Sequence, residues 1–120
     1  MVNMASKELS NVVIKIFENT GIADGGKFSD KWDSDDNYIL RHIFIKADGA
    51  KTTKSTITIR IRNEAITKDK ALCNTFGTNA EDALLLNIRL NRSDTFEYEG
   101  TNAEGATKDF TVELVMEKVG

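Results

Sequence analysis

The chain has 120 residues and a mass of 13.3 kDa; 40% of its residues are hydrophobic, 29% are charged, and its net charge at pH 7 is −3. This size predicts one domain with one core, and the acidic balance argues against a nucleic-acid-binding protein, which needs positive charge to neutralise phosphates. A single cysteine, Cys73, excludes an intrachain disulfide.

No apolar run reaches the length of a membrane span, and the first residues lack the basic start and apolar block of a secretory signal. We therefore expect no membrane association, and a location in the cytoplasm or in a virus particle.

Alternation of apolar and polar residues, the period of a β-strand, runs through most of the chain. Residues 1–10 are weakly patterned and are expected to form an N-terminal arm. Residues 12–18 form the first predicted strand, which is apolar on both faces and is therefore expected to be covered on both sides. Residues 19–37 are rich in glycine and aspartate, and predict a long loop or a short edge strand held down by Phe28 and Trp32.

The remaining predicted strands are residues 38–47, 55–62, 71–76, 83–91, 95–99 and 109–119, with a turn at Asp48 and Gly49 and a polar crossing at 64–70. Seven to eight strands in one domain, residues 11–120, predict an all-β protein. Its expected form is an antiparallel two-sheet sandwich of the jelly-roll type. The immunoglobulin signature, a tryptophan between two cysteines, is missing.

One pentapeptide, Gly-Thr-Asn-Ala-Glu, occurs twice, at residues 77–81 and 100–104. Small polar residues with glycine are typical of hairpin connections. The repeat therefore predicts two hairpins, one within residues 71–91 and the other within residues 95–119.

Carboxylates are concentrated in residues 30–37, and calcium prefers six to eight oxygen ligands. A calcium site is therefore one interpretation of this segment, with Asp30, Asp33, Asp35 and Asp36 as ligands. The order of residues does not match an EF-hand loop, and a solvated acidic loop is the alternative.

Trp32 and Tyr38 are close enough in sequence to form a platform on which a sugar stacks, with Asn37 and Arg41 as polar neighbours. The alternative is that the two rings only hold the loop against the sheet. We expect no other small-molecule ligand and no cofactor.

Charge is unevenly distributed along the chain. Residues 46–70 hold seven basic and three acidic residues, whereas residues 81–117 hold nine acidic and three basic ones. One interpretation is that neighbouring strands carry complementary outward charges. The other is a head-to-tail contact between subunits. Its residues would be Lys51, Lys54, Arg60, Arg62, Glu97, Glu99, Glu113 and Glu117.

No catalytic motif is present, and His42 and Cys73 each lack a recognisable partner, so we assign no catalytic residues and expect a protein that is not an enzyme. The alternating strands 55–62 and 83–91 and the closing segment 94–119 resemble the small jelly-roll proteins that build or decorate virus and phage particles. This resemblance implies a structural role through self-association or attachment to a shell. The alternative is a carbohydrate- or surface-binding module, with calcium as a possible stabiliser.

Overall fold

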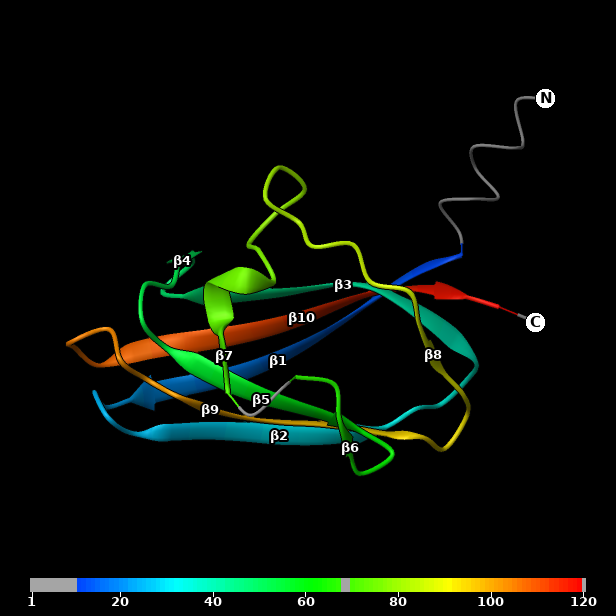
Figure 1. Ribbon diagram of the computed structural model, residues 1–120, viewed down its shortest axis with the longest axis horizontal. Helices are drawn as coiled ribbons and strands as arrows, with labels where there is room; N and C mark the ends of the chain where they lie inside the picture. The colour runs from blue at the N-terminus through cyan, green and yellow to red at the C-terminus, as the bar shows by residue number, and fades with distance from the viewer. Residues whose placement is uncertain (1–10, 68–69, 120) are drawn as a thin grey trace.

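The computed structural model describes residues 11–67 and 70–119, which form two antiparallel β-sheets packed face to face (Figure 1). The predicted arm at residues 1–10 and part of the crossing at 64–70 lie outside the described residues. The strands are β1 (Val12–Ile22), β2 (Lys27–Asp33), β3 (Tyr38–Ala47), β4 (Ala50–Lys51), β5 (Thr56–Ile61), β6 (Glu64–Ala65), β7 (Ala71–Leu72), β8 (Ile88–Leu90), β9 (Thr95–Thr101) and β10 (Lys108–Lys118), with one 3₁₀ turn, η1 (Cys73–Thr75).

Strand pairing is nested along the chain. Strand β1 pairs with β10, β2 with β9, β3 with β8 and β5 with β7, as in one long hairpin. Rolling this hairpin brings β10 beside β3 and β9 beside β5. Sheet A then has the order β1-β10-β3, with β4 and β8 both on β3, and sheet B the order β2-β9-β5, with β6 and β7 both on β5. This arrangement confirms the predicted jelly-roll-like sandwich; the strand count exceeds the prediction because two short strands of two residues each, β4 and β6, were not predicted.

The core lies between the two sheets and follows the alternation in the sequence. Every second residue of β5 points inward and is at most 1% exposed, and the same holds for the middle of β10. Aromatic rings fill one part of the layer, where Phe28 stacks on Phe110 with ring centroids 4.2 Å apart. Each such buried side chain stabilises the fold by about 1.5–3 kcal/mol relative to an exposed one.

Residues 19–37 contain more strand than loop. Strand β1 continues to Ile22, and β2 is an edge strand whose Phe28 is buried. The edge-strand interpretation is therefore the correct one.

The prediction of a strand at residues 83–91 is mostly wrong, because only β8 within this segment is extended and paired. The preceding segment touches the edge of β3 at separate points, through hydrogen bonds from Ile45 N to the Gly77 carbonyl and from Leu86 N to the Arg41 carbonyl. Since no continuous ladder holds this segment, its leucines do not alternate, and Leu84 and Leu85 are exposed. The strand predicted at 71–76 likewise ends after β7 and becomes η1.

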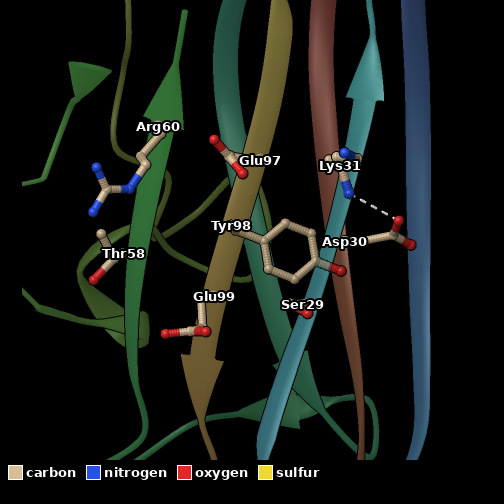
Figure 2. A pocket seen from close by; sticks show the side chains of 8 residues that line it. All are labelled: Ser29, Asp30, Lys31, Thr58, Arg60, Glu97, Tyr98 and Glu99. Atoms are coloured by element: carbon tan, nitrogen blue, oxygen red, sulfur yellow. Dashed lines mark hydrogen bonds between the residues drawn. The ribbon is translucent and has the colours of Figure 1, made fainter. Parts of the chain in front are cut away.

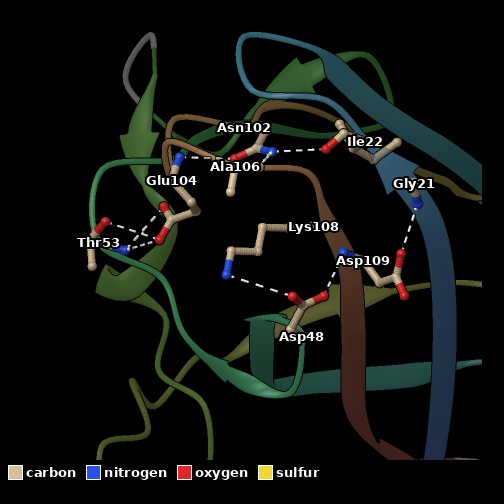
Figure 3. Close-up of polar contacts among 9 residues, drawn as sticks. All are labelled: Gly21, Ile22, Asp48, Thr53, Asn102, Glu104, Ala106, Lys108 and Asp109. Atoms are coloured by element: carbon tan, nitrogen blue, oxygen red, sulfur yellow. Dashed lines mark hydrogen bonds and ion pairs between the residues drawn. The ribbon is translucent and has the colours of Figure 1, made fainter.

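Neither copy of the repeated pentapeptide forms a hairpin. The first lies between η1 and β8, and the second joins β9 in sheet B to β10 in sheet A, so both connections pass from one sheet to the other. Figure 1 shows the first copy in the yellow-green loop at the top and the second in the orange loop at the left end. The local turn is nonetheless the same in both copies. Asn79 Oδ1 accepts from Glu81 N at 2.8 Å in the first. In the second, which Figure 3 shows, Asn102 Oδ1 accepts from Glu104 N at 2.9 Å.

Candidate interaction surface

The two rings of the predicted sugar platform pack on each other. Trp32 and Tyr38 have centroids 6.1 Å apart, and Tyr38 is buried. The Tyr38 hydroxyl donates to Asp35 at 2.7 Å, and this bond, with burial, raises the pKa of Tyr38 to about 12. Asn37 accepts from the Arg92 amide, while the Arg41 guanidinium binds Glu117 and Asn87. The geometry therefore offers no open pair of rings, and sugar binding stays a prediction that it does not favour.

The four predicted calcium ligands each have a separate hydrogen-bonding partner. Asp30 accepts from the Lys31 amide, Asp33 from the Thr95 hydroxyl and Asp35 from Tyr38. Asp36 accepts from the Asn37 amide, which together with Lys118 lowers the pKa of the Asp36 carboxyl. Among the described residues, no three His, Cys, Asp or Glu side chains are grouped to hold a metal ion. Calcium binding stays a prediction.

The outer face of sheet B carries a polar groove of about 620 Å³, shown in Figure 2. Charges alternate across it, because Glu97 on β9 lies between Lys31 on β2 and Arg60 on β5. Nearby, Arg62 forms an ion pair with Asp94 at 2.8 Å. The structure thus places Arg60, Glu97 and Glu99 together, as complementary neighbours within one sheet; this arrangement matches the first interpretation of the charge pattern. The groove is lined by Ser29, Asp30, Lys31, Thr58, Arg60, Glu97, Tyr98 and Glu99.

The other predicted interface residues belong to sheet A or its loops. Lys51 on β4 and Lys54 in the following loop are exposed. Glu113 and Glu117 lie on the outer face of β10, and Glu117 forms an ion pair with Arg41 at 2.8 Å. The eight residues are therefore spread over both outer faces and do not form one surface.

The two candidate reactive side chains are each engaged in packing. His42 stacks on Phe44, with centroids 5.6 Å apart, and its Nδ1 lies 3.0 Å from the Leu84 carbonyl oxygen. Cys73 is fully buried, and this burial raises the pKa of its thiol to about 12. A thiol with such a pKa is protonated at neutral pH and is a poor nucleophile.

The largest departure from expectation is an exposed apolar row on β1. Val12, Ile14 and Ile16 are 44%, 53% and 51% exposed. They point outward from sheet A, opposite Glu117, Val115 and Glu113 on β10. The sequence predicted a strand covered on both sides; within the described residues only the inner side is covered, since the other sheet packs there. In the sequence, the presence of apolar residues on both faces of the strand at 12–18 was the signal that indicated this exposed apolar row.

Lys15 lies on the inner side of β1, at the side of the sandwich formed by the edge strands β1 and β2 of the two sheets. The Lys15 ammonium lies 5.6 Å from the centre of the Phe17 ring and 5.7 Å from that of Trp32 on β2. Such cation–π contacts hold the lysine over the gap between the two edge strands. The lysine therefore does not extend along the outer edge of β1.

Comparison with known protein families and with curated proteins gave no match to this chain. No helix in the described part of the chain is long and apolar enough to span a membrane.

Proposed function

We propose that this chain is a non-enzymatic structural protein that works by self-association, of the kind that builds or decorates virus or phage particles. One observation carries the proposal: the edge strand β1 exposes three large apolar side chains in a row, each about half accessible. A row of exposed apolar side chains of this kind is typical of a protein-contact site.

The energetic argument supports a contact through this row. Burying apolar surface gains about 25 cal/mol for each Å², so covering three half-exposed aliphatic side chains on two partners is favourable before any backbone hydrogen bond is counted. Edge strands are also the natural place for pairing between chains, because one side of their backbone lacks a ladder partner.

The fold is compatible with this role. Jelly rolls occur in viral capsid proteins, and also in lectins and cupins, so the fold by itself does not choose among these functions. The exposed β1 row favours assembly over sugar binding, because the aromatic rings that a sugar would stack on are packed together.

Light scattering on the full-length protein over a wide concentration range tests the proposal. We expect the weight-average mass to rise above the 13.3 kDa of one chain as concentration increases. A mass that stays at one chain up to the highest soluble concentration would contradict self-association.

A further inference from the structure

Among the described residues, the edge of β1 that faces away from β10 has no ladder partner over residues 12–18. Lys118 N donates to the Asn11 carbonyl at 2.7 Å, which makes this opposing pair a hydrogen-bonded one. In a regular antiparallel ladder the direction alternates, so the odd-numbered residues of β1 bond to β10 and the even-numbered ones direct their N–H and C=O groups to the free edge. The first register shift comes only after Asn19. Within the described part of the chain, the backbone groups of Val12, Ile14, Ile16 and Glu18 at this edge are therefore unpaired. The first three of these residues also expose an apolar side chain.

We propose that β1 pairs antiparallel with β1 of a second copy of this chain about a two-fold axis at Ile14, which joins the two A sheets into one continuous sheet. This inference rests on the proposed function and names its partner and geometry. Ile14 then lies opposite Ile14, and Val12 lies opposite Ile16 of the other copy. The exposed apolar row thus meets its own copy, as a two-fold contact requires.

Charge and apolar pairing together select this register over its neighbours. Even-numbered residues must face even-numbered ones, so the nearest alternatives are centred on Val12, Val13, Lys15 or Ile16. Centring on Val12 or Val13 would leave Ile16 without an opposite residue inside β1, which begins at Val12. Centring on Lys15 would put that lysine directly opposite itself, and like charges facing each other across strands are unfavourable. Centring on Ile16 would set Ile14 against Glu18. With the axis at Ile14, Lys15 lies opposite Val13, and no charged residue of the described strand faces an apolar side chain of the outer row.

The glutamates on β10 border the contact without opposing it. Across the joined sheet, one row runs from Glu117 through Val12 and Ile16 of the second copy to Glu113 of that copy. These two glutamates are then three strand spacings apart, or about 14 Å. That distance exceeds the Debye length of about 8 Å at physiological ionic strength, so their repulsion is screened. The central row is apolar throughout, because Val115 flanks Ile14 on each side.

Single cysteines on the outer row report the register by disulfide trapping. Ile14→Cys should form a disulfide-linked dimer on mild oxidation, because hydrogen-bonded opposing Cα atoms lie about 5.5 Å apart. Val12→Cys and Ile16→Cys should each fail to link alone, since like residues are then about 14 Å apart along and across the strands. Mixed together, these two variants should link to each other. The native Cys73 is buried and does not compete.

Substitution to lysine tests the same contact without a cross-link. Ile14→Lys should raise the dimer dissociation constant at least about tenfold, since it places two lysines face to face in an apolar strip. Leu85→Lys is the matched control, because Leu85 is 72% exposed but lies in the loop before β8. That variant should leave the dissociation constant unchanged. Circular dichroism should show an unchanged fold in both variants, as both positions face solvent in one chain.

The results of these experiments distinguish a failure of the proposed β1 contact from a failure of the proposed function on which it rests. Linkage of Ile14→Cys to Ile16→Cys, or of Ile16→Cys to itself, would overturn the register. Undiminished association of Ile14→Lys would overturn the β1 contact but leave self-association standing. A wild-type protein that is monomeric at every concentration would remove both.

Discussion

Glu104 anchors the loop that precedes β5. Its carboxylate accepts hydrogen bonds from three consecutive backbone amides, those of Thr53, Lys54 and Ser55, at 2.8 to 3.2 Å. The hydroxyls of Thr53 and Ser55 donate at 2.9 and 2.6 Å. Figure 3 shows the Thr53 contacts beside the second copy of the pentapeptide. Successive amides that point at one anion form a compact anion-binding arrangement, and here the chain supplies its own anion.

Replacing this carboxylate should destabilise the protein. Glu104→Gln loses the charge and one acceptor oxygen, so some of the five donors lose their partner. We expect the free energy of unfolding to fall by about 1–3 kcal/mol, measured by urea denaturation. Glu81→Gln is the matched control, because Glu81 holds the same place in the first copy of the pentapeptide and is exposed. Its effect should lie within about 0.5 kcal/mol of zero.

The same carboxylate makes stability depend on pH. Burial raises the pKa of Glu104, but the hydrogen bonds from Ser55 and Thr53 outweigh this and lower the pKa from 4.5 to about 2. A carboxyl with a lowered pKa in the folded state stabilises the fold above its unfolded-state pKa. We therefore expect this contribution to be complete above pH 4.5 and to be lost as the pH falls toward 2. Urea midpoints measured across this range should fall less steeply for Glu104→Gln than for the wild type.

Strands β2 and β9 fit together through a glycine. Gly100 lies opposite Phe28 in the register, and a Cβ atom at this glycine would clash with the far end of the Phe28 ring. Because that ring is stacked on Phe110 in the core, it has little room to move.

Gly100→Ala should therefore destabilise the sandwich through overpacking, by about 1–3 kcal/mol in the free energy of unfolding. The double variant with Phe28→Leu tests whether the contact with Phe28 causes this loss of stability, since the smaller side chain leaves room for the new methyl group. We expect the double variant to be less destabilised than the sum of the two single variants. If the effects of the two substitutions on the free energy of unfolding were additive, the destabilisation by Gly100→Ala would have a cause other than the Phe28 contact.

The strands differ in how well their positions could be predicted from the sequence. The segments at 55–62 and 109–119 alternate between buried and less buried residues, and 38–47 does so apart from one register shift at Arg41. All three have strand neighbours on both sides and the opposite sheet on one face, which favours alternation. Residues 83–91 show a similar apolar content, but their backbone bonds to β3 only at separate points. A strand needs a neighbour as well as a pattern, and one sequence does not show where the neighbour lies.

The jelly-roll winding leaves the two edge strands β1 and β2 along the same flank of the molecule, where Lys15 reaches from one to the other. Two contacts are candidates for the proposed self-association at the scale of the whole molecule. One is the apolar contact through β1, and the other is the head-to-tail charge contact suggested by the uneven charge distribution.

Salt distinguishes these two contacts. Raising the ionic strength from about 0.1 to about 1 M shortens the Debye length from about 10 to about 3 Å and weakens contacts between exposed charges. We expect the dimer dissociation constant, measured by sedimentation, to stay level or fall over this change because the β1 contact is apolar. A steep rise would point to the charged residues, and Lys54→Glu would then weaken association more than Ile14→Lys does.

Sequence alone determined the all-β class, the sandwich and most of its long strands, because alternation reports directly which residues share a buried face. It also determined the turn that both pentapeptides make, since that turn closes within three residues. Only the tertiary structure decided that both connections cross between sheets, that Trp32 and Tyr38 pack together, and that no described segment covers the apolar outer row of β1. Each of these depends on which segments become neighbours, and the nested pairing brings together residues as far apart as Val12 and Glu117.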